Sequence, residues 1–516
     1  MEMTRGSGVL LHISSLPGRY GIGNLGAPAR QFVDFLAEAE QRYWQFLPVG
    51  PFSEIASYSP YMSFSAFAGN PVFIDLDQLA EEGLVGRAEL DAAPDFSEYE
   101  VDFERVIEFN GQILTRAYKA FVDGGKSEAY RAFRDRETRL VNFAFFAALR
   151  ERHDQLPWYK WPAAIAGRDP EAMDSWRLKL AERIDFHLFR QYLFFHQWDE
   201  LRSYANSRDV AMVGDIPIYV GHDSVDVWAN PDCFRLDPDS LLPVKVAGVP
   251  PDYFSETGQR WGNPLYRWRV DGRVNRRLYD WWGERFKAMF RIADICRIDH
   301  FRGFESFWEI DYEEKTAVNG NWGKGPGAEF FDEMAKHIGE LPIIAEDLGQ
   351  ITPEVFELRR RFGFPGMKVL QFAFDSDSKN PYLPHNYQSI DSVVYTGTHD
   401  NDTTLGWFGG DQVGDETRKK VKRYLRTESG EISRELIRLA MASVAAIAIF
   451  PMQDVLGFGN DCRMNTPGTS EGNWRWRCAP RFISREAARW LKDETEFYNR
   501  LGRDEELREN PEEEHE

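Results

Sequence analysis

The sequence predicts an α/β fold, a (β/α)8 barrel, from three observations. Eight short apolar runs are typical of strands that are buried on both faces, as in a parallel sheet. Helix-like segments separate several of these runs, which favours parallel strands joined by crossovers. Three of the runs are followed closely by a carboxylate, namely Asp299, Glu346 and Asp400. Acids at the C-terminal ends of barrel strands meet at one mouth of the barrel, where such enzymes keep their active sites.

The expected elements follow one another in a regular order. The strands are predicted at residues 9–13, 43–49, 210–220, 295–299, 341–347, 367–374, 392–397 and 444–450. Helices are predicted at 27–41 and 352–363, the second beginning where Thr352 can cap free N–H groups before Pro353. The last strand has an alternative, because its apolar run could equally finish the preceding helix.

Two stretches between strands are too long for simple crossovers within a single catalytic domain, 1–516. Residues 75–205, between the second and third strands, carry long helical patterns and predict a mainly helical insertion. Residues 221–280, between the third and fourth strands, are dense in Pro, Gly, Asp and Trp and predict a loop-rich insertion. Long ordered loops of this kind are usually functional. Residues 503–516 form an acidic tail.

The composition excludes several classes of partner. A formal net charge of −21 argues against nucleic acid and against an anionic membrane surface. The four cysteines lack metal-type spacing and are interpreted as reduced thiols of a cytoplasmic protein. No signal-peptide core and no run near 18 apolar residues is found, so no membrane association is expected. The 16 Trp, 20 Tyr and 38 Phe residues offer flat apolar faces on which sugar rings dock well.

Two of the acids have neighbours that suit opposite roles. Arg297 stands two residues before Asp299, so both side chains should point to the same side of a strand. An adjacent arginine lowers a carboxyl pKa by about one to three units, which suits a nucleophile, although a structural ion pair is the alternative. Glu346 ends an apolar run, where burial raises a carboxyl pKa as a general acid needs. Asp347 should point to the opposite face.

The third acid follows a histidine. His399 and Asp400 could together grip sugar hydroxyls and stabilise positive charge. A His-Asp pair can also bind a metal, but no further cluster at ligand spacing supports that alternative, so no metal is expected. A nucleophile, a general acid and a further acid are what cleavage of a glycosidic bond requires.

Three other motifs each have more than one interpretation. Residues 21–26 match G-x-G-x-x-G, but they do not follow a strand directly, and a tight barrel loop is favoured over a nucleotide site. The loop 258–264 offers Gln259, Trp261 and Asn263 for substrate binding. The Trp-Arg-Trp-Arg run at 474–477 is favoured as a structural element with internal cation–π contacts.

Long motifs carry a family resemblance along nearly the whole chain. They are LHISSLPG, SAFAGNP, GDIPIYVGHDSVDVW, GQRWGNPLY, RIDHFRG, AEDLG, TGTHDNDT and RMNTPG with NWRWR. In this order they resemble the amylomaltases, the 4-α-glucanotransferases of glycoside hydrolase family 77. The resemblance implies a (β/α)8 barrel with inserted subdomains and no C-terminal β-sandwich. It also implies transfer of α-1,4-glucan chains to the 4-hydroxyl of glucose or another glucan, without a cofactor.

The same resemblance assigns roles to individual residues. Asp299 would be the nucleophile, Glu346 the general acid/base and Asp400 the transition-state stabiliser. The substrate-binding residues would be Arg297, His399, Asp215, Tyr61, Gln259, Trp261, Asn263 and Asn465. The chain departs from the family at Met62, where the usual reading of the segment is SPYQS, so acceptor-side contacts are the part least determined by the resemblance.

Two alternatives remain beside the transferase. An α-glucan hydrolase would use the same three acids, with water in place of the acceptor sugar. A non-catalytic glucan-binding protein would not need all three acids. Retention of the α configuration predicts that the carboxyl groups of Asp299 and Glu346 lie about 5–5.5 Å apart, because the nucleophile attacks directly.

Overall fold

Eight parallel strands close into a barrel, which confirms the predicted fold class. The computed structural model describes residues 4–52, 54–251, 255–411 and 413–502, so the predicted tail at 503–516 lies outside the described residues. Around the barrel the strands run in the order β1-β14-β13-β12-β11-β8-β3-β2. These strands are β1 (Gly6–Leu10), β2 (Tyr43–Gln45), β3 (Ala211–Pro217), β8 (Ile295–Asp299), β11 (Ile343–Ala345), β12 (Gly366–Val369), β13 (Ser392–Tyr395) and β14 (Ile447–Pro451).

The first strand begins three residues before its predicted start. The sequence predicts a strand at 9–13 because the apolar residues begin there, whereas the ladder with β14 already starts at Gly6. Gly8 explains the apparent gap in the pattern. A Cβ atom at Gly8 would lie 2.3 Å from the carbonyl oxygen of Tyr43, so glycine allows β2 to approach closely.

The sixth predicted strand is correct only in its first half. Residues 366–369 pair with β13, but Leu370–Phe374 form a 3-10 helix, η7, where a strand was expected. The apolar residues continue because the turn is also buried. Phe374, for example, packs against Trp407 and Tyr424. A short apolar run reports burial, and it does not distinguish a strand from another buried conformation.

The last strand closes the barrel. β14 pairs with β13 on one side and with β1 on the other, so the alternative in which residues 444–450 finish a helix is wrong. The preceding helix, α16 (Ile432–Ala442), ends five residues earlier. Arg500 supports this closure from the end of the described chain. Its guanidinium, which is fully buried, donates to the carbonyls of Gly6 and Ala446, one beside each of the two strands.

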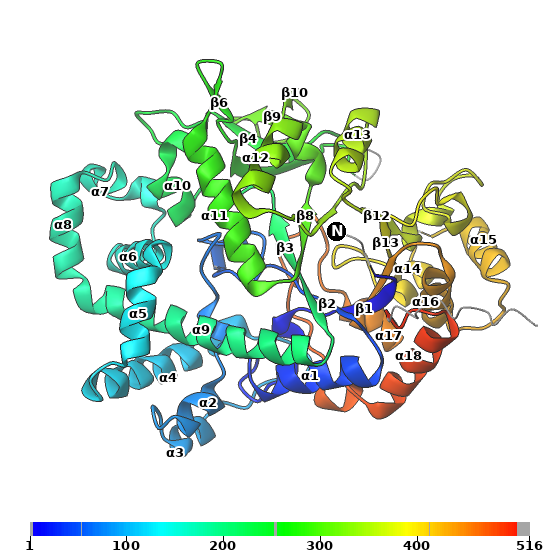
Figure 1. The fold of residues 1–516 in the computed structure, drawn as a ribbon, viewed down its shortest axis with the longest axis horizontal. Coiled ribbons are helices and arrows are strands. Elements are labelled where there is room, and N and C mark those ends of the chain that lie inside the picture. Colours follow the sequence, from blue (N-terminus) through cyan, green and yellow to red (C-terminus); the bar gives the residue numbers. More distant parts are fainter. Residues whose placement is uncertain (1–3, 53, 252–254, 412, 503–516) are drawn as a thin grey trace, which may run out of the picture.

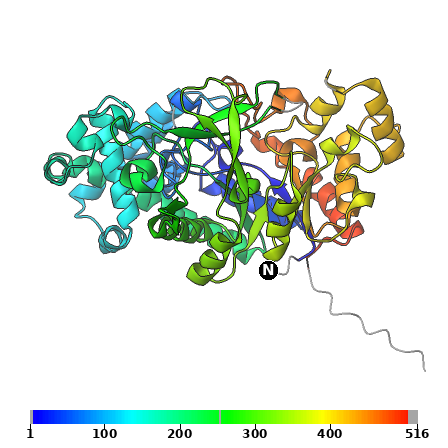
Figure 2. The same ribbon diagram turned by 90° about the horizontal axis from the view of Figure 1, so that it is seen from above.

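Two groups of helices lie on opposite sides of the molecule. Figure 1 shows α4 to α8 on one side and α14 to α16 on the other, and Figure 2 shows the same division from above. Between β2 and β3 the helices are α2 (Leu76–Glu81), α3 (Arg87–Asp91), α4 (Phe103–Asp123), α5 (Glu128–Arg136), α6 (Thr138–Arg152), α7 (Ala163–Ala166), α8 (Pro170–Lys179) and α9 (Ala181–Ser207). All eight of these helices begin within the range 75–205, for which helical character is expected.

The remaining helices lie between or after the other strands. They are α1 (Ala27–Glu38), α10 (Val225–Ala229), α11 (Arg276–Ile292), α12 (Ala328–Ile338), α13 (Pro353–Arg361), α14 (Thr404–Gly409), α15 (Asp415–Leu425), α17 (Met452–Val455) and α18 (Arg485–Phe497). Helices α1 and α13 correspond to the two predicted at 27–41 and 352–363. Thr352 occupies the N-cap position of α13, but its hydroxyl makes no capping hydrogen bond. Among the described residues no helix is long and apolar enough to cross a membrane.

A second sheet lies at the mouth of the barrel, beside the acids. Its strand order is β10-β9-β4-β5, all antiparallel. Its strands are β4 (Lys245–Val249), β5 (Gln259–Pro264), β9 (Ser306–Asp311) and β10 (Gly320–Lys324), and a hairpin of β6 (Arg269–Val270) and β7 (Arg273–Val274) lies nearby in sequence. The tract 221–280, expected to be rich in loops, therefore contributes two strands to an ordered sheet. Short strands rich in Gly, Pro and Arg lack the apolar alternation by which strands are recognised.

Candidate active site

Asp215, Asp299 and Glu346 come together because their strands are neighbours in the barrel. β3, β8 and β11 lie side by side, and the register pairs Asp215 with Arg297 and Ala345 with Ile298. Glu346, one residue beyond Ala345, donates its backbone N–H to the carbonyl of Ile298 at 3.0 Å. Glu346 is thereby level with Asp299 on the adjacent strand.

Arg297 joins two carboxylates beneath the mouth. Its Nη1 lies 2.7 Å from Oδ2 of Asp215, and its Nη2 lies 3.0 Å from Oδ1 of Asp299. The side chains of Arg297 and Asp215 are 4% and 0% exposed, whereas that of Asp299 is 31% exposed. Only Asp299 of the three is therefore open to a ligand, and the other two hold it in place. The predicted pairing of Arg297 with Asp299 is present.

Glu346 is held by backbone amides of both acid-bearing segments. Oε2 accepts the N–H of His300 at 2.7 Å, and Oε1 accepts the N–H of Leu348 at 2.8 Å. His300 follows Asp299 directly and has a left-handed backbone, with φ of 56°. This conformation is uncommon for residues other than glycine and is concentrated at functional sites. It turns the amide of His300 towards Glu346, so one turn positions both carboxyl groups.

Burial raises the pKa of both groups. The pKa of Asp299 is raised to about 6, with Arg297 opposing the effect of burial, and the pKa of Glu346 is raised to about 7 by burial and by the nearby Asp299. The expectation that Arg297 gives Asp299 a lowered pKa is wrong, because loss of solvent outweighs the ion pair. Arg297 nonetheless opposes the effect of burial at Asp299, whereas the nearby Asp299 adds to it at Glu346.

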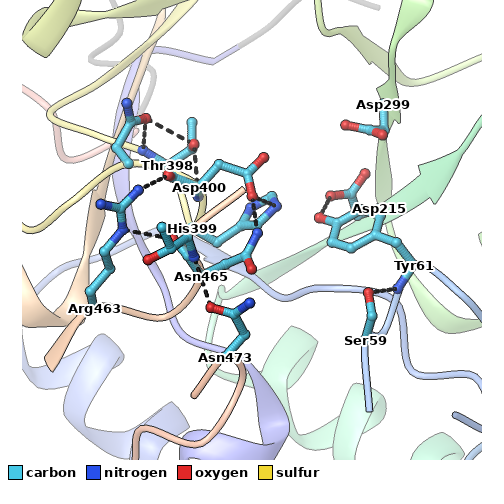
Figure 3. Close-up of polar contacts among 12 residues, drawn as sticks. Ser59, Tyr61, Asp215, Asp299, Thr398, His399, Asp400, Arg463, Asn465 and Asn473 are labelled. Atoms are coloured by element: carbon cyan, nitrogen blue, oxygen red, sulfur yellow. Dashed lines mark hydrogen bonds and ion pairs between the residues drawn. The ribbon is translucent and has the colours of Figure 1, made fainter. Parts of the chain in front are cut away.

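Tyr61 connects the two sides of the site. Its hydroxyl donates to Oδ2 of Asp215 at 2.8 Å, and its ring stacks on His399 with centroids 5.1 Å apart. Burial, together with Asp215, raises the pKa of Tyr61 well above its ordinary value, so the phenol remains a hydrogen-bond donor. Figure 3 shows Asp299, Asp215 and Tyr61 on one side and the group around Asp400 on the other.

Asp400 is fixed from the segment that follows β14. Nδ2 of Asn465 donates to its Oδ1 at 2.6 Å, and Arg463 donates to its backbone carbonyl at 2.8 Å (Figure 3). Nε2 of His399 lies 3.4 Å from the same carboxylate oxygen. Because 45% of the Asp400 side chain is exposed, its other oxygen is available to a ligand. Asn465, assigned to substrate by the resemblance, contacts Asp400 in this structure.

The residues predicted from a loop at 258–264 lie on strand β5 instead, and they divide into two groups. Trp261 packs edge-on against the ring of His300 at 4.8 Å, and Gln259 accepts the Trp261 indole N–H at 3.1 Å. These two side chains therefore lie next to the acid-bearing turn. Asn263 is buried, and its amide donates to the carbonyl of Val220 at 2.9 Å. Its NH2 group thus braces this strand, with Sδ of Met62 as a second, longer contact.

Two further neighbours of His399 and Asp400 were not predicted as parts of the site: Arg463 was not singled out from the sequence, and Trp474 was favoured as part of a structural run. Arg463 supports Asp400, and Trp474 lies within 6.0 Å of both the Tyr61 and the His399 rings. Arg475, by contrast, lies over Phe103 and not over a tryptophan of its own run. The cation–π contacts expected within 474–477 are therefore replaced by this contact. Asp347 bonds to the N–H of Met367 and to Arg359, away from the site.

The described residues contain no group of three or more His, Cys, Asp or Glu side chains that could hold a metal ion. Figure 3 shows instead that the polar partners of Asp400 are amide, guanidinium and imidazole groups. The arrangement is therefore one of carboxyl groups supported by hydrogen-bond donors. Such a set can attack an electrophilic carbon, donate a proton and stabilise positive charge.

Comparisons with known proteins agree with this chemistry. The family model for 4-alpha-glucanotransferase, glycoside hydrolase family 77, matches residues 11–483. A 4-alpha-glucanotransferase of Synechocystis sp. is 50% identical over 502 residues, 96% of this chain and 98% of that protein. One from Thermus thermophilus is 47% identical over 514 residues, covering 97% and 100%. The solved amylomaltase from Streptococcus agalactiae in complex with acarbose is 40% identical, with a TM-score of 0.91 and coverage of 96% and 99%.

Proposed function

Because the chain belongs to the 4-alpha-glucanotransferase family, glycoside hydrolase family 77, we propose that Asp299, Glu346 and Asp400 carry out its reaction. The enzyme moves α-1,4-glucan segments from a donor to an acceptor. The proposal concerns which side chains perform each step, with what stereochemical outcome, and on which acceptors. It rests on the geometry of the carboxyl groups described above.

In the first step the carboxylate of Asp299 attacks the anomeric carbon of a donor glucose unit. The glycosidic bond breaks, and Glu346 donates its proton to the departing 4-oxygen. The transition state has oxocarbenium character, and the carboxylate of Asp400 stabilises that positive charge; its 45% exposure supports this role. A covalent glycosyl ester on Asp299 and a free glucan with a new 4-hydroxyl result.

In the second step Glu346, now ionised, takes the proton from the 4-hydroxyl of an incoming sugar. The resulting oxygen nucleophile attacks the anomeric carbon, and Asp299 leaves as a carboxylate. Two inversions at the same carbon restore the α configuration. No proton or electron is gained or lost overall, so the reaction needs no cofactor.

The contacts of the two carboxyl groups are the observation that supports these roles most directly. Asp299 lies 3.0 Å from Nη2 of Arg297, a cation that favours its charged form, as a nucleophile needs. Burial and the nearby Asp299 raise the pKa of Glu346, as a general acid needs. The exposure of Asp299 gives the anomeric carbon access to it.

Acceptors are proposed to be glucose and the non-reducing ends of maltodextrins. Trp261, next to His300 and the acid-bearing turn, supplies a flat face on which such a ring can stack. A stacked sugar displaces water from the intermediate and favours transfer over hydrolysis. The four unpaired cysteines support a cytoplasmic enzyme.

The test is incubation of the purified protein with maltotriose, followed by separation of all products. Transfer yields glucose together with maltotetraose, maltopentaose and longer chains, and the number of reducing ends stays constant. Glucose and maltose alone, with rising reducing ends, would instead identify a hydrolase. Asp299→Asn serves as the control, since any activity that survives it does not depend on the proposed nucleophile.

A further inference from the structure

A carboxylate outside the catalytic set holds both ends of the loop that bears Asp400. This anchor is Asp454, on the short helix α17 directly after β14, and it is fully buried. One oxygen accepts the Thr404 backbone N–H at 2.6 Å. The other accepts the hydroxyls of Thr396 at 2.5 Å and of Thr404 at 2.7 Å. Thr396 directly follows β13 and Thr404 is the first residue of α14, so the two threonines enclose the loop 397–403, which contains His399 and Asp400.

The loop also contacts neighbouring segments, but these contacts are made by residues that lie between the two threonines. Arg463 and Asn465 contact Asp400 itself. Nε2 of Gln371 donates to the carbonyl of Asp402, and Nδ2 of Asn460 donates to its carboxylate. Inside the loop, Oδ1 of Asn401 accepts both the N–H and the hydroxyl of Thr398. Asp454 is therefore the group through which strand β14 fixes the separation of the loop ends at β13 and α14.

Burying a carboxyl group at this position is unfavourable by itself. Burial raises the pKa of Asp454, and the nearby Asp402 carboxylate raises it further. The three hydrogen bonds come from uncharged hydroxyl and amide groups, which stabilise a carboxylate less than a cation would. An apolar side chain could fill the same space, but it could not accept three hydrogen bonds from two different segments.

We propose that Asp454 is a positioning residue for the reaction, acting by setting the location of Asp400 in the site. The inference rests on the proposed function, in which Asp400 stabilises the transition state. When the anchor is lost, Thr396 and Thr404 no longer share a partner, and Asn465 and Arg463 alone remain from the segment after β14 to hold Asp400 in its position relative to Asp299. A displacement near 1 Å in a catalytic group can cost about a hundredfold in rate.

The matching experiment compares Asp454→Ala with Asp454→Asn. The alanine variant removes all three hydrogen bonds, and kcat for maltotriose disproportionation should fall about 10- to 100-fold while KM changes less than about threefold. The carboxamide of asparagine can accept the Thr404 N–H and donate to the threonine hydroxyls. It should therefore retain kcat within about fivefold of the wild type. An asparagine variant as slow as the alanine variant would overturn the proposal.

A control separates positioning from general loss of stability. Asp185, on α9 in the helical insertion, also accepts three hydrogen bonds, from Tyr118, Tyr130 and Lys126. Asp185→Ala should lower the melting temperature and leave kcat unchanged when assayed well below that temperature. If Asp454→Ala likewise changed only the melting temperature, Asp454 would be structural and the inference would be wrong.

A double-mutant cycle tests whether the effect passes through Asp400. The substrate is α-maltotriosyl fluoride with maltose as acceptor, because fluoride leaves without protonation and keeps slow variants measurable. If Asp454 acts by placing Asp400, then Asp454→Ala should cost less than about twofold in an Asp400→Asn background. A full and additive loss in that background would contradict the inference.

The outcomes also separate this inference from the proposed function. Absence of longer maltodextrins with the wild-type protein would refute the transferase itself. An Asp400→Asn variant with wild-type kcat would refute the role of Asp400, and with it the inference. Full activity in Asp454→Ala, with Asp400→Asn inactive, would refute the inference alone.

Discussion

The ring of Tyr61 lies nearly parallel to the imidazole of His399, with an interplanar angle of 17° and centroids 5.1 Å apart. The hydroxyl of the same tyrosine donates to Asp215, which is bound in turn to Arg297. One side chain therefore connects the side of the site that carries Asp299 to the side that carries Asp400. These two sides come from β-strands that are not adjacent in the barrel, so the connection is not made by the backbone ladder.

Replacing Tyr61 in two ways should separate its two contacts. Tyr61→Phe keeps the stack and loses one hydrogen bond to a buried charge, worth about 1.5 to 3 kcal/mol, so kcat/KM for maltotriose should fall about 10- to 100-fold. Tyr61→Ala also loses the stack on His399 and should be slower again, by about tenfold. Equal rates for the two variants would show that the stack contributes nothing.

The pH dependence of the reaction should be bell-shaped. Activity requires ionised Asp299, so it should rise with pH through about 6, and protonated Glu346, so it should fall above about 7. The two limbs belong to the pair of interacting carboxyl groups and not to each alone. Initial rates at low maltotriose concentration, measured between pH 4 and 9, report these limbs for the free enzyme. A profile that stays flat from pH 5 to 9 would contradict the pair.

Asp299→Asn should become more stable relative to the wild type as pH rises. The pKa of Asp299 is near 3.8 in the unfolded chain and about 6 in the folded protein. Between these values the unfolded chain releases the proton while the folded protein retains it, so the wild type loses stability as pH rises, and above 6 the loss is constant. The asparagine variant should gain about 1 to 2 kcal/mol between pH 4 and pH 7, after allowance for the partial exposure of Asp299. Thermal unfolding at several pH values measures this gain, with exposed Asp239→Asn as the baseline.

Asn465 is expected to act on Asp400 through its 2.6 Å hydrogen bond. Asn465→Ala removes the donor and should lower kcat about tenfold, since one oriented donor near a developing charge typically contributes one to a few kcal/mol. Asn465→Asp should be worse, because it sets a second negative charge against Asp400. Exposed Asn319→Ala is the matched control and should retain full activity. An aspartate variant faster than the alanine variant would exclude this account.

Trp261 should control the competition between sugar and water. Removing its ring in Trp261→Ala takes away the proposed acceptor platform without touching the three acids. The share of turnovers that end in hydrolysis should rise severalfold, because water then reaches the glycosyl intermediate more often. The ratio of new reducing ends to transferred chains measures this share. An unchanged ratio would mean that Trp261 is not the surface on which the acceptor stacks.

The sequence predicts the barrel well because its strands are buried on both faces. Burial leaves continuous apolar runs, such as 295–299, and this run coincides with β8 at both ends. The prediction was less accurate where the backbone conformation does not follow from the pattern of apolar side chains. Gly6 and Gly8 extend β1 without any apolar signal, and Leu370–Phe374 are buried without being a strand. Periodicity reports which residues are buried, and it does not report which backbone conformation buries them.

The site was predictable where chemistry demands a residue type at a strand end. Asp299, Glu346 and Asp400 stand out because a carboxylate is unexpected directly after a buried apolar run. Their supports do not stand out, because the interactions are long-range. Arg463 and Asp454 belong to a segment more than 50 residues after Asp400, and only the closing of the barrel beside β13 makes them neighbours. The sign of the Asp299 pKa shift also depends on burial in three dimensions, which the Arg-x-Asp spacing does not reveal.

The pairing of β1 with β14 has a consequence for folding while the chain is being synthesised on the ribosome. The barrel closes through residues about 440 positions apart, and Arg500 completes the seam from still further along the sequence. Synthesis at about 5 to 20 residues per second therefore leaves β1 with an unpaired edge for roughly 20 to 90 seconds. Unpaired strand edges are sites of aggregation. A nascent chain of this protein thus depends, during that interval, on whatever shields the edge of its first strand.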